Sequence, residues 1–381
     1  MLRIVIASDS FKGSLSSSEV AEAVTLGITD AFPDNCVISS VAIADGGEGT
    51  IEAILKSASG TIIKARAHDP LGRPAICSYA AINGDTAIIE TALASGLTLL
   101  NENERNPLNT SSYGTGELIL DALERGFRKF IIGLGGSATN DGGTGMLEAL
   151  GYRFFDKEGE RIYGCCGGKL EQIALIDSSE ASAALEDSYF TVACDVNTTF
   201  CGPQGATMVF SAQKGADVEM QFTLEKGMLS LSEYIKRKYG KDLENTPGAG
   251  AAGGLGGAFY TFLNSRIISG IDMILDTVGF DDMIRNADLV ITGEGRIDSQ
   301  TAKGKVVSGV LARCSHINIP VIAIAGIIDM TEDEKSMTGF KAILPIQPRP
   351  VGHTELQIAM KPENSIRNIR NTIFNYFKNE L

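Results

Sequence analysis

The feature that most limits the fold of this 381-residue chain is an alternation of apolar runs and amphipathic segments near both ends. Residues 2–7 form an apolar run that is typical of a strand buried on both faces. The pattern Ser16–Glu19 fits a capping box and predicts a helix to about residue 31. A second strand at 37–43 and a helix at 49–58 follow. This order is typical of a parallel sheet with crossover helices.

The middle of the chain has a different pattern. Residues 61–67, 75–82 and 85–90 read as short strands, and Asn83-Gly84 between the last two predicts a β-hairpin. Further along we predict a helix at 114–125, strands at 129–134 and 189–194, and a helix at 221–239.

The α/β alternation returns near the end of the chain, with strands predicted at 288–292, 320–325 and 341–346 and helices at 301–314 and 365–378. We therefore expect an α/β protein in which residues 1–64 and 285–381 form a doubly wound, Rossmann/flavodoxin-like parallel-sheet domain. We expect residues 65–284 to form an inserted mixed α/β domain. Whether residues 108–142 rejoin the terminal sheet is left open.

Composition excludes several classes of protein. Lys and Arg number 33 against 47 Asp and Glu, a net charge of −14 that is unsuited to a general nucleic-acid surface. The longest uncharged stretch, 245–265, is too weakly apolar for a membrane span. The seven cysteines form no C-x-x-C pair, and the first residues lack a signal-peptide pattern. We expect a cytoplasmic protein with neither nucleic-acid nor membrane partners; the oligomeric state is open, and a homo-oligomer is compatible with the sequence.

Glycine-rich polar loops follow four of the predicted strands, at 8–14, 44–50, 135–143 and 293–298. Ligands of open parallel sheets bind beyond the carboxyl ends of the strands. A single loop of this kind is usually an ordinary helix entry, but four of them favour a ligand site.

The residue types in these loops point to phosphate and metal chemistry. Glycine exposes backbone N–H donors, while carboxylates tolerate phosphate only with a divalent cation between them, usually Mg²⁺. Lys12 and Arg296 can stabilise a transferred phosphoryl group, and one carboxylate can accept the proton of the attacking hydroxyl, which contributes ~10²–10⁴-fold. Taken singly, Asp45 or Asp141 could equally cap a helix, and Lys12 could simply be solvated.

Two glycine motifs differ in how strongly they indicate nucleotide binding. Gly248–Gly253 matches G-x-G-x-x-G but follows Pro247 rather than a strand, so close packing through small residues is the better interpretation. Gly133–Ala138 matches G-x-G-x-x-A and does follow a strand, which makes it the better nucleotide-contact candidate. The chain has no Walker A motif.

At these loops the sequence resembles the type-1 glycerate kinases of bacteria. The matching segments are S-D-S-F-K-G-S-L-S (8–16), A-D-G-G-E-G-T (44–50), R-N-P-L-N-T (105–110), G-T-G-E-L-I (114–119), G-G-S-A-T-N-D-G-G (135–143), A-C-D-V (193–196), P-G-A-G-A-A-G-G (247–254) and V-I-T-G-E-G-R-I-D-S-Q (290–300). Ser8 and Thr91 depart from the usual Pro and Met. The last fifty residues match weakly, so the resemblance assigns no functional role there.

The resemblance implies a two-domain enzyme whose interdomain cleft holds the substrates. It would phosphorylate D-glycerate with ATP and Mg²⁺, usually giving 2-phosphoglycerate in glyoxylate and aldarate breakdown. We expect Lys12 and Arg296 to stabilise the transferred phosphoryl group. Asp195 is the first candidate for the general base, and Asp298 is the second. Asp45 and Asp141 are the predicted Mg²⁺ ligands. Asp298 would help Asp45 to hold the ion or to orient the substrate. The predicted substrate- and nucleotide-binding residues are Asp9, Ser10, Gly13, Ser14, Gly46, Gly47, Gly135, Gly136, Ser137, Asn140, Gly293, Glu294 and Gly295.

Two other functions remain open at this point: a metal-dependent phosphatase acting on phosphoglycerate with the same loops, and a sensor that binds an organic acid and a nucleotide without catalysis. The many carboxylates argue against the sensor. The kinase interpretation depends on Lys12, Asp45, Asp195 and Arg296 converging on one pocket.

Overall fold

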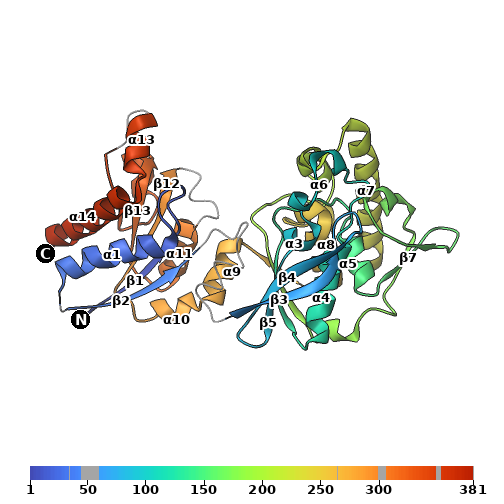
Figure 1. The fold of residues 1–381 in the computed structure, drawn as a ribbon, viewed down its shortest axis with the longest axis horizontal. Coiled ribbons are helices and arrows are strands. Elements are labelled where there is room, and N and C mark those ends of the chain that lie inside the picture. The colour runs from blue at the N-terminus through green and yellow to red at the C-terminus, as the bar shows by residue number, and fades with distance from the viewer. Residues whose placement is uncertain (34, 44–59, 264, 299–305, 349–352, 381) are drawn as a thin grey trace. The chain divides into compact units, whose positions relative to one another are not determined.

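The computed structural model describes residues 1–33, 35–43, 60–263, 265–298, 306–348 and 353–380, and the chain divides into two compact units (Figure 1). Unit 1 comprises Met1–Gly46 and Gly270–Leu381, and unit 2 comprises Gly47–Ser269. The expected fold class, a parallel-sheet domain built from both chain ends with an inserted mixed α/β domain, is confirmed.

The boundaries between the units differ from the predicted ones. Strand pairing explains the difference at the first boundary, and ion pairing explains it at the second. Strand β3 (Gly60–His68) pairs antiparallel with β4 (Pro74–Ile82) and so belongs to unit 2. Strand β6 (Lys129–Gly133) pairs with strands of the same unit, so residues 108–142 do not rejoin the terminal sheet.

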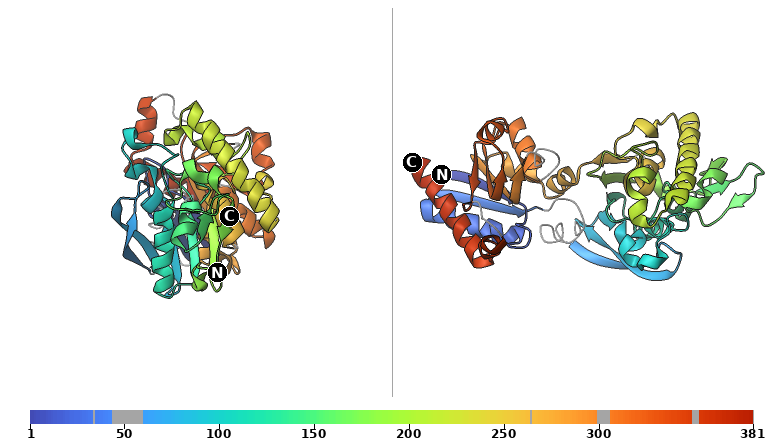
Figure 2. Two further views of the ribbon diagram at one scale, coloured as in Figure 1. Left: turned by 90° about the vertical axis from the view of Figure 1, so that its right-hand side faces the viewer. Right: turned by 90° about the horizontal axis from the view of Figure 1, so that it is seen from above.

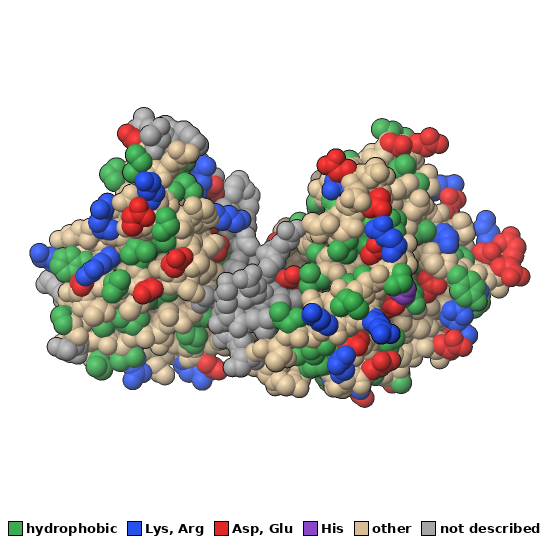
Figure 3. All heavy atoms as spheres, in the orientation of Figure 1, with side chains coloured by type: hydrophobic (Ala, Val, Ile, Leu, Met, Phe, Trp, Pro, Cys, Tyr) green, Lys and Arg blue, Asp and Glu red, His purple; other side chains and the backbone are tan. Residues whose placement is uncertain are grey.

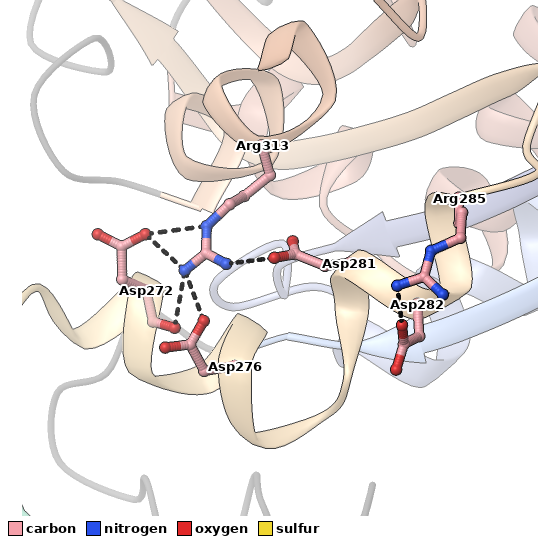
Figure 4. Close-up of polar contacts among 6 residues, drawn as sticks. All are labelled: Asp272, Asp276, Asp281, Asp282, Arg285 and Arg313. Atoms are coloured by element: carbon pink, nitrogen blue, oxygen red, sulfur yellow. Dashed lines mark hydrogen bonds and ion pairs between the residues drawn. The ribbon is translucent and has the colours of Figure 1, made fainter. Parts of the chain in front are cut away.

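At the second boundary, a salt-bridge cluster ties residues 270–284 to unit 1 (Figure 4). Arg313 of α11 (Val306–His316) reaches Asp276 at 2.7 Å, and Asp272 and Asp281 at 3.0 Å each. These carboxylates lie on α9 (Gly270–Thr277) and α10 (Phe280–Ile284), so unit 1 resumes at Gly270, 15 residues before the predicted boundary at 285.

The sheet of unit 1 has five parallel strands in the order β14-β13-β12-β1-β2. From the adjacent pair β1 and β12 the chain proceeds outward in opposite directions, which is a topological switch point. Alternate residues face opposite sides: Ile322 and Ile324 pack in the cluster with α1 and α14, while Ala323 and Ala325 pack with Val307 of α11. Helices therefore cover both faces of the sheet (Figure 2).

The helix that follows β1 begins at the predicted capping box. The Oγ of Ser16 accepts a hydrogen bond from the N–H of Glu19, and the Glu19 carboxylate accepts one from the N–H of Ser16. The remaining elements of unit 1 are β1 (Leu2–Ser8), α1 (Ser17–Ala31), β2 (Cys36–Ala42), β12 (Leu289–Asp298), β13 (Val321–Asp329), α12 (Glu332–Ser336), β14 (Ala342–Pro345), α13 (His353–Ala359) and α14 (Pro362–Glu380).

Unit 2 contains a six-stranded mixed sheet in the order β11-β10-β6-β5-β4-β3 and a small sheet in the order β8-β7-β9. The predicted hairpin is confirmed, since β4 and β5 are antiparallel and Asn83 and Gly84 both have positive φ. The strands not yet given are β5 (Thr86–Glu90), β7 (Arg153–Phe155), β8 (Arg161–Ile162), β9 (Leu175–Asp177), β10 (Tyr189–Ala193) and β11 (Arg266–Ile268).

The helices of unit 2 surround one large apolar core. They are α3 (Ala92–Ser95), α4 (Tyr113–Glu124), α5 (Thr144–Ala149), α6 (Ala206–Phe210), α7 (Val218–Tyr239) and α8 (Ala251–Phe262), with short 3₁₀ helices at Leu97–Leu99, Glu102–Glu104, Gly167–Gln172, Ala183–Leu185, Ala212–Lys214 and Leu243–Asn245. The helix predicted at 49–58, the loop 44–50 and the start of the helix predicted at 301–314 lie outside the described residues.

Candidate functional site

The switch point of unit 1 brings the loop after β1 onto strand β12. The N–H of Asp9 donates to the Gly293 carbonyl at 2.9 Å, and the Ser8 hydroxyl donates to the same oxygen at 3.0 Å. A Cβ placed on Gly295 would lie 3.6 Å from the backbone nitrogen of Lys12. Two of the four glycine-rich segments therefore lie side by side, although the bonded residues Ser8 and Gly293 are 285 residues apart in sequence.

The prediction that residues 293–298 form a loop was wrong. Strand β12 continues through them to Asp298, paired with β13 from Val290 opposite Val321 to Asp298 opposite Asp329. Only glycine fits at position 293 of this ladder without a shift of its neighbours, because a Cβ there would lie 2.5 Å from the side chain of Ile324. Gly293, Glu294 and Gly295 therefore belong to a rigid strand, and Glu294 is 7% exposed.

A pocket of about 340 Å³ opens at this switch point, and every residue that lines it belongs to unit 1. Its polar wall comes from the loop after β1 and from β12: Asp9, Ser10, Lys12, Ser14, Glu294 and Arg296. Its apolar wall comes mainly from the carboxyl-terminal part of the chain: Phe11, Ile327, Ile346, Leu356, Ala359 and Met360.

Positive charge enters the pocket through Lys12 and Arg296, both of which are exposed. The guanidinium of Arg296 forms an ion pair with Asp329 of β13, whose side chain is only 19% exposed. Asp329 was not predicted from the sequence, although its register opposite Asp298 follows from the parallel pairing. Asp298 ends β12 two residues beyond Arg296 and is not among the residues that line the described part of the pocket.

The resemblance assigns no functional residue to the last fifty residues, but part of that segment lies at the pocket. Met360 and Ser365 line the pocket, and the Ser365 hydroxyl lies 2.7 Å from the hydroxyl of Ser14. The terminal methyl group of Met360 lies over Gly13, 2.8 Å from where a Cβ would stand. Helices α13 and α14 thus form one side of the pocket.

The third glycine-rich segment, Gly135–Asp141, follows β6 in unit 2. Asp141 is fully buried, and its carboxylate accepts hydrogen bonds from the N–H and hydroxyl of Ser112, both at 2.7 Å, and from the N–H of Gly143 at 3.0 Å. Burial raises the pKa of Asp141, and these donors oppose the rise. These contacts suit a carboxylate that organises a loop, so its role as a Mg²⁺ ligand stays a prediction.

The Gly248–Gly253 motif packs against this loop. Gly253 has φ +69°, and a Cβ on it would lie 1.9 Å from the Thr139 carbonyl. The packing interpretation is therefore confirmed for this motif.

Sequence reasoning missed one buried cation beneath the loop. Lys214 is 2% exposed, and its Nζ donates to the Ser137 hydroxyl at 2.9 Å and to the Thr139 carbonyl at 2.7 Å. Burial lowers the pKa of Lys214 to about 7, and the Asp141 carboxylate opposes this shift. No local pattern marks this residue, since a lysine in Gln213-Lys214-Gly215 resembles an ordinary surface lysine.

The predicted site residues therefore fall into three sets. Lys12, Arg296, Asp9, Ser10, Ser14, Glu294 and Gly295 meet at one pocket of unit 1. Gly135, Gly136, Ser137, Asn140 and Asp141 share one loop of unit 2, and Asp195 is exposed just after β10 of that unit. Asp45, Gly46 and Gly47 lie outside the described residues. The convergence of Lys12, Asp45, Asp195 and Arg296 on one pocket therefore stays a prediction.

Within the described ranges, no group of three or more His, Cys, Asp or Glu side chains is arranged to hold a metal ion. None of the helices described is both long and apolar enough to cross a bilayer. On the face drawn in Figure 3, acidic and basic side chains are interspersed over both units rather than gathered by sign.

Comparison with known proteins finds relatives over most of the chain. The sequence profile of the Glycerate kinase family matches residues 4–378. A glycerate kinase of Bacillus subtilis (strain 168) is 44% identical over 351 residues, covering 92% of this chain and 91% of its own. A glycerate 2-kinase of Escherichia coli (strain K12) is 46% identical over 334 residues, covering 87% and 86%.

A solved structure gives the same result. The crystal structure of a protein provisionally designated glycerate kinase 2, from Salmonella typhimurium LT2, superposes with a TM-score of 0.84 at 40% identity. The match covers 100% of this chain and 98% of the other. The resemblance identified from the sequence motifs is confirmed: the chain belongs to the glycerate kinase family.

Proposed function

We propose that the protein transfers the γ-phosphoryl group of ATP to a hydroxyl of D-glycerate, with Mg²⁺ as the metal and 2-phosphoglycerate as the product. The observation that carries this proposal is the pocket at the switch point of unit 1, where Lys12 and Arg296 share one wall with Ser10 and Ser14. Phosphoryl transfer depends mainly on positioning and on charge stabilisation, which two cations and hydroxyl donors can supply. Family membership and the name of the E. coli relative support the substrate and the product.

The apolar wall of the pocket suggests which substrate it receives. Glycerate carries a carboxylate and two hydroxyls on three carbons and has no apolar surface to bury. Leu356, Ala359 and Met360 on one side, with Lys12 and Arg296 on the other, fit a nucleotide, whose base is apolar on its faces and whose phosphates are anionic.

The proton of the attacking hydroxyl needs a carboxylate acceptor. Asp195 remains our first candidate because it is exposed directly after β10, at the carboxyl end of a parallel strand. Asp298 is the second candidate. The variants Asp195→Asn and Asp298→Asn separate them when they are compared at saturating Mg²⁺, since loss of the base lowers kcat by roughly 10²–10⁴-fold there, whereas loss of a metal ligand raises the Mg²⁺ concentration needed for activity.

The carboxylates of unit 1 are compatible with Mg²⁺. A Mg²⁺ ion that is bound chiefly by substrate phosphates needs only one or two protein carboxylates. Asp298 and Asp329 are register partners on adjacent strands, and Asp9 lines the pocket. We propose that Asp298 and Asp45 both hold the ion, which would neutralise phosphate charge when bound.

We further propose a cytoplasmic enzyme of organic acid breakdown, in glyoxylate metabolism. The metal-dependent phosphatase considered from the sequence gains no support from the site or from the relatives. One assay tests the kinase: release of ADP from ATP, with and without D-glycerate and Mg²⁺. Release that requires both components supports the proposal, and phosphorus NMR of the product distinguishes 2- from 3-phosphoglycerate. Hydrolysis of phosphoglycerate without ADP formation would contradict it.

A further inference from the structure

The loop after β6 exposes a short run of backbone donors. Gly135 and Gly136 are exposed, and Gly136 has φ +69°, a conformation that favours glycine. Their carbonyl groups are engaged: that of Gly135 accepts from the Thr91 hydroxyl at 3.3 Å and that of Gly136 from the N–H of Leu97 at 2.9 Å. The N–H groups of Gly135, Gly136 and Ser137 have no acceptor in the described part of the chain. Successive free N–H groups in such a turn form a concavity that binds anions.

Lys214 braces this loop from its buried side. The two acceptors of its ammonium, the Ser137 hydroxyl and the Thr139 carbonyl, flank Ala138 immediately after the exposed donors. Lys214 ends the 3₁₀ helix Ala212–Lys214, and the adjoining Gly215 packs against the backbone of Arg105. The ammonium is therefore fixed between two packed segments.

Stability alone gives a poor reason for this cation. Burying an ammonium group carries a penalty of several kcal/mol after relaxation, and apolar residues of similar volume are often as stable or more stable at such positions. The carboxylate of Asp141 compensates part of the charge, but its own oxygens are engaged by Ser112 and Gly143. In a medium of low dielectric constant such a charge acts strongly on a nearby anion, which gives a functional reason for burying it.

Building on the kinase activity proposed above, we propose that Lys214 is a positioning residue that orders an anion-binding site at Gly135–Ser137. By holding Ser137 and Thr139, its ammonium keeps the three backbone N–H groups directed at an anionic oxygen group of one substrate. That group is either a phosphate of the nucleotide or the carboxylate of glycerate, which present the same oxygen acceptors.

The test is Lys214→Met, which keeps the length of the side chain and removes the charge. The matched control is Lys169→Met, since the Lys169 ammonium also donates to a carbonyl, that of Tyr163 at 2.6 Å, but Lys169 is only half-buried and lies at the surface rather than in the interior. Calorimetric titration with ADP and, separately, with D-glycerate gives the dissociation constant for each ligand, and steady-state kinetics gives both KM values.

We expect Lys214→Met to weaken one of the two ligands by about tenfold or more, as loss of a charge-assisted contact does, and to leave the other within twofold. The affected ligand identifies the anion. A purely structural role would not produce this selectivity, since a damaged fold weakens both ligands and lowers kcat together. Unchanged dissociation constants for both ligands in folded Lys214→Met would overturn the proposal.

Ser137→Ala keeps the proposal testable if Lys214→Met does not fold. This variant removes one of the two acceptors and should weaken the same ligand by about threefold; equal effects on both ligands, or none, would contradict the inference. If the wild-type protein phosphorylates no glycerate, the proposed function fails independently. Binding of inorganic phosphate by wild-type protein and not by Lys214→Met would then still support the anion site, and equal binding would exclude it.

Discussion

The guanidinium of Arg296 on β12 is ion-paired with the carboxylate of Asp329 on the neighbouring strand β13. Because Arg296 is exposed and lines the pocket, Asp329 directs a cation that would otherwise be free to move in solvent. We expect Arg296→Met to lower kcat by about 10²–10³-fold, the usual effect of removing one transition-state donor. Asp329→Asn should have a smaller effect, because it leaves the charge and loosens only its orientation.

The matched control is Arg285→Met, since Arg285 pairs with Asp282 in an exposed i,i+3 arrangement within unit 1 (Figure 4). Its turnover should equal that of the wild-type protein. A kcat for Arg296→Met within threefold of wild type would remove Arg296 from the mechanism.

Lys12 is the second cation of the pocket, on the loop that follows β1. Replacing it by Met keeps most of the side-chain volume and removes the charge, so kcat should fall by about 10²–10³-fold while the urea midpoint of unfolding stays unchanged. Lys335→Met is the control, since Lys335 pairs with the exposed Glu332 and is not among the residues that line the described part of the pocket. Near-normal turnover of Lys12→Met would exclude a role in phosphoryl stabilisation.

The elements and the polar wall of the pocket could be predicted because their signals are local. Apolar runs predict buried strands, and Ser16–Glu19 marks the start of α1. Once β1 and β12 are parallel neighbours, the segments that follow them must meet at one edge of the sheet, which places Lys12 beside Gly295.

Tertiary packing decided what the sequence could not predict. Gly293 and Gly295 suggested a turn, but the ladder with β13 extends strand β12 through both residues. Met360 reaches Gly13 only because α13 and α14 pack beside the loop after β1. The burial of Lys214 depends on contacts with a loop about 75 residues earlier in the chain, and no pattern around Lys214 itself records them.

The capping box of α1 gives a prediction about stability. The Ser16 hydroxyl contacts both the backbone and the side chain of Glu19, so Ser16→Ala removes both interactions and should lower the free energy of unfolding by about 1 kcal/mol. Ser18→Ala, an exposed serine two residues further on, should change that energy by less than about 0.5 kcal/mol. Equal losses in the two variants, measured by urea unfolding, would contradict the importance of the cap.

The buried ammonium of Lys214 makes stability depend on pH. Its pKa is about 7 in the folded protein, below the ordinary 10.5 of the unfolded chain, because burial disfavours the charged form. Between these values the unfolded state binds more protons, so this group makes the protein more stable as pH rises from 7 towards 10, by at most about 1.4 kcal/mol per pH unit. The free energy of unfolding of wild type minus that of Lys214→Met should therefore increase over this range. A difference that does not change with pH would contradict the assignment of this pKa.

The absence of tryptophan from the chain allows a direct test of the apolar wall. A single Trp introduced by Met360→Trp would stand in the wall of the pocket, whereas one introduced by Met337→Trp would stand at a position that is 86% exposed. If the wall receives the nucleotide base, ATP with Mg²⁺ should change the emission of the Met360→Trp variant and leave that of the Met337→Trp variant unchanged. The KM for ATP should rise only in the Met360→Trp variant, because the larger ring occupies part of the roughly 340 Å³ of space. A response to D-glycerate alone, with none to ATP, would instead assign this pocket to the acid substrate.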